Sequence, residues 1–142
     1  MRLNLAILLP MLLLALAAGR ANAQEQIVSF ASALRLQHDG RLVVTETLRA
    51  HGQGRIIRHG LYRDLPLGIK EDGRFIPAPV TVHRLTRNGV TEPHFTRRAS
   101  GMLRVYFGRK DVLLPAGEHR YVFTYSLPGH VQHLEKYDEL SW

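Results

Sequence analysis

Residues 26–48 read QIVSFASALRLQHDGRLVVTETL, and apolar and polar side chains alternate on both sides of a turn in this stretch. A period of two is that of an extended strand, in which successive side chains point to opposite faces. The turn, His38-Asp39-Gly40, has the residues that a tight connection between antiparallel strands needs. The apolar side chains predicted to face one way are Val28, Phe30, Leu34 and Leu36 on the first strand and Leu42, Val44 and Leu48 on the second. The stretch therefore predicts a β-hairpin.

Glu46 interrupts the apolar face of the second strand, because its position places a carboxylate between Val44 and Leu48. An unpaired buried charge is costly, and long charged side chains are rarely fully buried. We therefore expect Glu46 to lie near the strand end and to reach water. The alternative is a buried ion pair.

The segment from Arg58 to Pro66, RHGLYRDLP, has a residue order that burial alone does not explain. Gly60 can adopt backbone angles that are closed to other residues, while Pro66 fixes its own φ and restrains Leu65. We predict that the segment is a stiff connection between strands.

Arg63 has a planar guanidinium group that can bind one carboxylate through two parallel hydrogen bonds. Glu46 and Asp64 are the carboxylates that we expect to be near it. We favour a structural role, in which the charge pair fixes the geometry of the connection. In the functional alternative, Arg58, His59 and Arg63 point outward as an anion-binding site.

Turn residues punctuate the rest of the chain. Strands are predicted over 80–87, 90–96, 102–107 and 119–127, and an exposed loop over 67–77. Asn88-Gly89 is a strong hairpin signal, and Pro93 marks an edge position or a bulge. Short strands without helical periodicity predict an all-β fold, a single antiparallel β-sandwich-like domain.

The N-terminus has the pattern of an export signal. Arg2 precedes an apolar run that is shorter than the roughly 20 residues of a membrane-spanning helix. Ala21-Asn22-Ala23 supplies the small residues of a cleavage site. We therefore predict a signal peptide over 1–23 and an exported, periplasmic or extracytoplasmic domain over 24–142. In the alternative, an uncleaved signal anchors the chain in the inner membrane.

The composition argues against several kinds of chemistry. The chain has no cysteine, and its eight histidines lack the spacing of a helical zinc site. His130 and His133 are close in sequence but fall in a predicted loop. No nucleophile elbow, phosphate-binding loop or dinucleotide fingerprint is present. We therefore expect no metal, no cofactor and no catalytic residue.

Cations outnumber acids, with 19 Lys and Arg against 12 Asp and Glu and a formal net charge of +7. Many of the cations lie between Arg84 and Lys110. Such a surface attracts an anionic membrane or an acidic envelope protein, whereas an exported chain rarely meets nucleic acid. The alternative is a solvated face. The sequence does not identify a small-molecule ligand. The candidate anion-binding residues are Arg58, His59, Arg63, Arg97, Arg98 and Arg104.

Several motifs follow one another in a recognisable order. They are Asp39-Gly40, Val44-Thr45-Glu46, Arg58 to Pro66, Phe107-Gly108, Gly117 to Tyr121 and Tyr137 to Trp142. This order resembles the domain of unknown function family 2207, predicted bacterial membrane proteins. The resemblance implies an extracytoplasmic N-terminal β domain followed by transmembrane helices, with no established reaction. Because relatives continue beyond the position of Trp142, we expect a C-terminal truncation relative to the family.

The residues of these motifs to which we assign a structural role are Glu46, Gly60, Arg63, Asp64, Pro66, Gly108, Asp138, Glu139 and Trp142. The expected function is that of a non-catalytic interaction or sensing domain. The alternative is an envelope enzyme or a carbohydrate-binding module that uses Asp64, Asp138, Tyr106, Tyr121 or Tyr125. A pocket with aromatic walls and converging carboxylates would favour the alternative. A basic face, with Glu46, Arg63 and Asp64 in one buried cluster, would favour the interaction domain.

Overall fold

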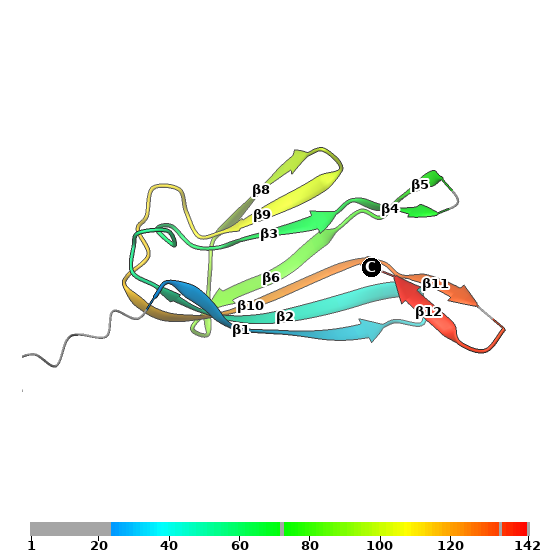
Figure 1. Ribbon diagram of the computed structural model, residues 1–142, viewed down its shortest axis with the longest axis horizontal. Helices are drawn as coiled ribbons and strands as arrows, with labels where there is room; N and C mark the ends of the chain where they lie inside the picture. Colours follow the sequence, from blue (N-terminus) through cyan, green and yellow to red (C-terminus); the bar gives the residue numbers. More distant parts are fainter. Residues whose placement is uncertain (1–23, 72, 134, 142) are drawn as a thin grey trace, which may run out of the picture.

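The computed structural model of the protein describes residues 24–71, 73–133 and 135–141 (Figure 1). Within these ranges the regular structure consists of 12 β-strands, which confirms the all-β prediction. None of the described residues belongs to a helix that is long and apolar enough to cross a membrane. The signal peptide predicted over 1–23 and the predicted structural residue Trp142 lie outside the described residues.

A five-stranded antiparallel sheet in the order β1-β2-β10-β6-β7 forms one layer. Its strands are β1 (Gln26–Leu36), β2 (Arg41–Gly52), β6 (Thr81–Arg87), β7 (Val90–Thr91) and β10 (Gly117–Pro128). The first two strands form the predicted hairpin: Leu36 lies opposite Leu42, and Gly40 has the positive φ of +77° that the turn requires. Strand β10 pairs with the other side of β2 along the full length of both strands.

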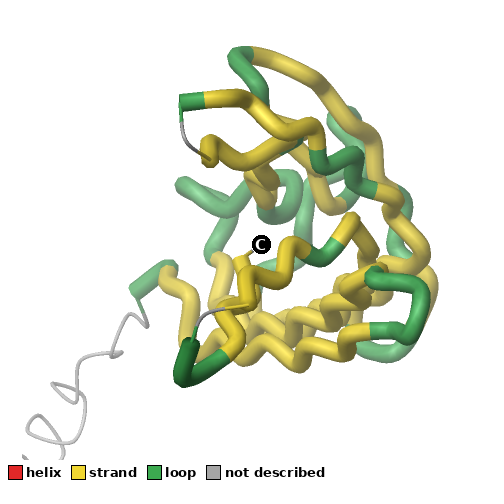
Figure 2. The backbone as a smooth tube through the Cα atoms, turned by 90° about the vertical axis from the view of Figure 1, so that its right-hand side faces the viewer, coloured by secondary structure: helices red, strands yellow, loops and turns green. Residues whose placement is uncertain are grey.

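A three-stranded antiparallel sheet in the order β3-β9-β8 forms the second layer. Its strands are β3 (Tyr62–Pro66), β8 (His94–Ala99) and β9 (Met102–Phe107). Figure 2, which looks along the long axis of the molecule, shows the strands in an upper and a lower group. Two small hairpins extend from one end (Figure 1): β4 (Gly68–Glu71) with β5 (Arg74–Pro77), and β11 (His130–His133) with β12 (Asp138–Ser141).

The hydrophobic core lies between the two layers. Strands β2, β9 and β10 alternate buried with more exposed positions, so every second side chain enters the core. Aromatic rings of the two sheets meet there, and the ring centroids of Phe107 on β9 and Phe123 on β10 are 5.1 Å apart. The core residues are Leu42, Val44, Leu48, Leu65, Leu85, Leu103, Val105, Phe107, Tyr121, Phe123, Tyr125 and Leu127. Two sheets that pack on a shared core confirm the predicted antiparallel sandwich.

The chain passes from one sheet to the other at Glu92-Pro93. The predicted turn at Asn88-Gly89 is present, with φ angles of +52° and +85°, and it joins β6 to β7. The single return strand predicted after this turn is wrong. Strand β7 has 2 residues, and β8, which begins at His94, belongs to the three-stranded sheet. Pro93 has no N–H to donate to a ladder, so the strand breaks there.

Three predicted loops or connections are strands. Residues 67–77, predicted to be an exposed loop, contain the β4–β5 hairpin, whose turn includes Gly73 with a φ of +74°. His130 and His133 lie in β11 instead of a loop. Most of the connection predicted to end at Pro66 is strand β3. These short strands depend on pairing partners that the local sequence does not show.

Strand β1 is an edge of its sheet, and all of its side chains are exposed. The register places three of the predicted apolar residues on the core side, opposite buried residues of β2: Phe30, Leu34 and Leu36. Val28 departs from the predicted face because the register shifts between Ile27 and Ser29. The core side of β1 is therefore an apolar strip that stays about half exposed, as shown by Phe30 at 50%.

Replacement of Gly60 by alanine is expected to destabilise the fold strongly. Gly60 has a φ of +132°, and an added Cβ would overlap the carbonyl oxygen of Phe107. Gly54→Ala is the matched control, because Gly54 has a φ of +76° but no atom within 4 Å of the added Cβ. Left-handed backbone costs about 1–2 kcal/mol, so Gly54→Ala should lose about that much stability and Gly60→Ala clearly more. Thermal unfolding tests this expectation, and equal losses would contradict it.

Candidate functional site

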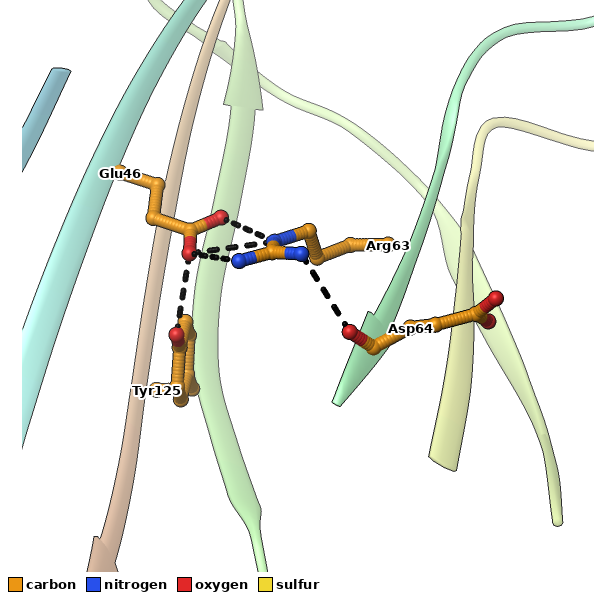
Figure 3. Close-up of polar contacts among 4 residues, drawn as sticks. All are labelled: Glu46, Arg63, Asp64 and Tyr125. Carbon is orange, nitrogen blue, oxygen red and sulfur yellow. Dashed lines mark hydrogen bonds and ion pairs between the residues drawn. The ribbon is translucent and has the colours of Figure 1, made fainter. Parts of the chain in front are cut away.

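Glu46 is buried in the middle of β2 and forms an ion pair with Arg63 of the facing strand β3 (Figure 3). The side chain is 1% exposed, and its two oxygens accept bonds of 3.0 and 3.2 Å from Nε and one of 3.1 Å from Nη2. The hydroxyl of Tyr125 on β10 donates to the same carboxylate at 3.0 Å. The expectation that Glu46 reaches water is therefore wrong. Strand β3 lies opposite and supplies the guanidinium group that makes burial of the carboxylate acceptable.

Asp64 does not join this cluster. Successive side chains of a strand point to opposite faces, so Asp64 points away from the core while Arg63 points into it. The carboxylate of Asp64 accepts bonds of 2.6 and 2.7 Å from Nε and Nη2 of Arg104 on β9. Arg63 contacts the backbone carbonyl of Asp64 instead, at 3.4 Å. The predicted three-residue cluster is therefore replaced by two ion pairs on opposite faces of β3.

Hydrogen bonds within the two ion pairs favour the charged forms of Arg63 and Asp64. The hydrogen bond with Glu46 raises the pKa of Arg63, and the hydrogen bond from Arg104 lowers the pKa of Asp64. Burial, followed by the charge of Glu46, raises the pKa of Tyr125, so its hydroxyl stays protonated and remains a donor. Donors and acceptors are matched, which suits a structural role in fixing β3 to β2 and β9.

A cleft of about 410 Å³ lies beside the three-stranded sheet, which is within the size range of small-ligand sites. It is lined by Ile56, Arg58, His59, Gly60, Leu61, Tyr62, Phe95, Arg97, Tyr106, Phe107, Gly108, Arg109 and Lys110. Four of these residues are cations, namely Arg58, Arg97, Arg109 and Lys110. Among its described lining residues there is no Asp or Glu. We call this site the basic cleft.

Aromatic side chains form one row across the three-stranded sheet and line the basic cleft. Tyr106 on β9 lies opposite Tyr62 on β3 and opposite Phe95 on β8. The rings of Phe95 and Tyr106 are stacked, with centroids 4.5 Å apart and planes 8° apart. Nζ of Lys110 lies 5.0 Å from the ring centre of Phe95, and Cζ of Arg104 lies 4.2 Å from that of Tyr62. The rings therefore cover one another and hold cations against their faces.

Two glycines bring the two sides of the basic cleft together. The segment at Gly60 approaches the carbonyl of Phe107, as described above. Gly108 has a φ of +99°, and an added Cβ would lie 2.5 Å from the carbonyl oxygen of His59. The N–H of Phe107 donates to the carbonyl of Leu61 at 2.8 Å. The segments before β3 and after β9 are therefore in direct backbone contact, and residues of both segments line the basic cleft.

Glu25 holds the loop that leads into the basic cleft. Its carboxylate accepts backbone bonds from Gln53 at 2.6 Å, from Arg55 at 2.9 Å and from Ile56. Desolvation acts to raise the pKa of Glu25, but the backbone donors together outweigh it and lower the pKa from 4.5 to about 2. The contact fixes the chain just before Arg58.

The structure divides the predicted anion-binding residues. Those that line the basic cleft are Arg58, His59 and Arg97. Arg63 instead points into the core, and Arg104 pairs with Asp64 on the outer face of the sheet. Arg98 follows Arg97 on β8 and therefore points to the other side of that strand.

The other predicted residues also separate. Gly60 and Gly108 line the basic cleft, whereas Pro66 ends β3. Asp138 and Glu139 lie in β12, which pairs with β11 and contributes no described residue to the basic cleft. Tyr121 and Tyr125 are buried in the core, so of the three tyrosines in the alternative function only Tyr106 reaches the basic cleft.

Sequence reasoning missed several residues of this site. They are Glu25, Tyr62 and Phe95. Arg109 and Lys110 belong to the predicted cation-rich stretch from Arg84 to Lys110, but they were not among the candidate anion-binding residues. Pairing between distant segments brings the missed residues together, and such pairing has no local signature. Within the described part of the chain, no group of three or more His, Asp or Glu side chains is placed to hold a metal ion.

The chain is similar to known proteins over most of its length. Residues 26–142 match the family described as "Predicted membrane protein (DUF2207) N-terminal domain". The chain is also similar to "Uncharacterized protein YciQ" of Escherichia coli strain K12, with 31% identity over 105 residues. That alignment covers 73% of this chain and 17% of the E. coli protein. No solved structure matches the chain.

Tyr125→Phe should lower the free energy of unfolding by about 1–2 kcal/mol, because it removes a hydrogen bond to a buried carboxylate. Tyr121→Phe is the matched control. Tyr121 is equally buried in the same strand, but its hydroxyl has no hydrogen-bond partner among the described residues. Urea denaturation should therefore show little change for Tyr121→Phe. Equal losses in the two variants would mean that the bond to Glu46 contributes no stability.

The loop held by Glu25 should be released only in strong acid. The folded pKa is lowered from 4.5 to about 2, so the stabilisation is complete above about 4.5 and is lost as the pH falls through about 2. The backbone amide resonance of Ile56 should follow this titration in NMR spectra. Glu25→Gln cannot ionise and should abolish it. A midpoint near 4.5 in the unmodified protein would show that the contact does not form.

Proposed function

Because the chain belongs to the DUF2207 family of predicted membrane proteins, through its N-terminal domain, we propose that it is an interaction or sensing domain of a cell-envelope protein. In this proposal the domain lies outside the cytoplasm and catalyses no reaction. It binds anionic groups of an envelope protein or a membrane surface through the basic cleft. The predicted export signal supports the location.

One observation carries the proposal: the basic cleft gathers Arg58, Arg97, Arg109 and Lys110 without a described Asp or Glu in its lining. Charges of one sign around a concave surface focus the electrostatic potential, so a cleft lined by cations attracts anions. Arg109 does lie 3.8 Å from Asp111, but both side chains are well exposed, so this pair neutralises little.

The placement of the carboxylates argues against an enzyme. The enzyme alternative expects carboxylates that converge on an aromatic pocket. Glu46, Asp64 and Glu92 are instead bonded to Arg63, Arg104 and Arg87, respectively. These pairs leave the basic cleft with cations, the imidazole of His59 and phenol groups, which can bind and orient an anion.

The aromatic residues support a carbohydrate-binding module less than they support an anion-binding interaction domain. Such modules need open ring faces, and two of the expected tyrosines are in the core. The rings of Phe95 and Tyr106 are stacked on each other, and cations lie over Phe95 and Tyr62. The ring faces of Phe95 and Tyr62 thus contact cations, and are not open surfaces on which a sugar could stack.

Binding to an immobilised sulfated polysaccharide tests the proposal. The double variant Arg58→Ala/Arg97→Ala should elute at clearly lower salt than the unmodified protein. The control Arg84→Ala/Arg120→Ala removes the same charge from exposed positions of the five-stranded sheet, on β6 and β10, and should elute later than the cleft variant. Identical elution of the two variants would show that net charge, and not the basic cleft, determines the attraction.

A further inference from the structure

We propose that the basic cleft binds a phosphoryl group carried on a small polar molecule, such as a lipid headgroup or a soluble phosphate ester. This inference rests on the proposed function and names the chemistry of the anion. Three features of the basic cleft support it: its charge, its rigidity and its size.

The charge of the basic cleft exceeds what a single carboxylate would balance. Its cations include three arginines and one lysine. A phosphomonoester carries about −1.5 to −2 charges at neutral pH and has three oxygens that accept strong hydrogen bonds. Guanidinium groups match these oxygens with paired donors, whereas lysine adds a compact point charge. A phosphoryl group can therefore engage several of these cations at once.

Strand pairing and backbone contacts hold the segments that carry the cations in place. Arg97 belongs to β8. Phe95 belongs to the same strand, and Nζ of Lys110 lies over its ring. Arg58 follows the loop that the carboxylate of Glu25 holds through backbone N–H groups. The segments that carry Arg58 and Lys110 are joined by the close approach of Gly60 to Phe107. Rigid placement lowers the entropy that an anion must lose on binding.

The size of the basic cleft leaves room for more than a bare ion. Its volume of about 410 Å³ lies in the range for small organic ligands. Apolar and aromatic surface from Leu61, Tyr62 and Tyr106 lines the remaining space. Tyr62 is 57% exposed, so its phenol group is accessible to hydroxyl groups of the molecule that carries the phosphate.

The test titrates the full chain with inorganic phosphate, glycerol phosphate and acetate, and follows the backbone amides of Gly60 and Gly108 by NMR. Both phosphates should shift these amides, whereas acetate at the same concentration should shift them far less. The apparent affinity for glycerol phosphate should fall at least about tenfold in Arg58→Ala/Arg97→Ala, because charge-assisted hydrogen bonds are lost. It should change little in Arg84→Ala/Arg120→Ala.

Vesicles distinguish the two sources of the phosphoryl group. Binding to phosphatidic acid vesicles but not to phosphatidylcholine vesicles, with weak binding of glycerol phosphate, assigns a lipid headgroup. Tight binding of glycerol phosphate with no preference for phosphatidic acid vesicles assigns a soluble ester. Either result supports the inference, provided that the Arg58→Ala/Arg97→Ala variant no longer binds the vesicles or the glycerol phosphate.

The inference is overturned if acetate shifts the same amides as strongly as phosphate, or if the cleft variant binds phosphate as well as its control. If the sulfated polysaccharide still depends on Arg58 and Arg97 in that case, the proposed function stands and only the phosphoryl group is wrong. If the polysaccharide is also indifferent to these residues, both proposals fail. Because Arg58 and Arg97 are exposed, their replacement should leave the melting temperature unchanged.

Discussion

The ion pair of Glu46 and Arg63 is the interaction on which the arrangement of the two sheets depends. It joins β2 of the five-stranded sheet to β3 of the three-stranded sheet, and Tyr125 adds β10 to the same carboxylate. Glu46 is buried, whereas the side chain of Arg63 is 38% exposed. Such a pair contributes little net stability, since desolvation of the carboxylate opposes the attraction, but it is costly to break because Glu46 would be left buried without a partner. It also disfavours a shift of β3 by one residue, because such a shift would place Asp64 or Tyr62 against Glu46 in place of Arg63.

This constraint determines the outer face of β3 as well. With Arg63 turned into the core, the alternation of the strand places Asp64 and Tyr62 on the opposite face. Asp64 then binds Arg104, and Tyr62 joins the row of rings that lines the basic cleft. The same parity that buries one charge thus builds one wall of the candidate site. The structural motif and the site are two faces of one short strand.

Local signals in the sequence predicted the elements that neighbouring residues specify. The hairpin turns at Gly40 and at Asn88-Gly89 are of this kind, as is the alternation in β9 and β10. The ion pairs were predicted only in part. Glu46 was one of the two carboxylates expected near Arg63, whereas Arg104 was not expected to pair with Asp64, which is 40 residues away in the chain. The basic cleft draws on the segments before β3, in β8 and after β9, so its lining could be assembled only from the pairing of the strands.

The distribution of charge follows from how the acids are placed. The chain has 12 Asp and Glu against 19 Lys and Arg, so cations remain after every acid has a partner. The more buried acids, Glu46 and Glu92, are paired with Arg63 and Arg87 because an unpaired carboxylate in the core would be costly. The surplus cations must then lie at the surface, where water solvates them. At the basic cleft, backbone contacts and aromatic rings bring part of that surplus into one concave site, and a general excess of charge becomes a local one.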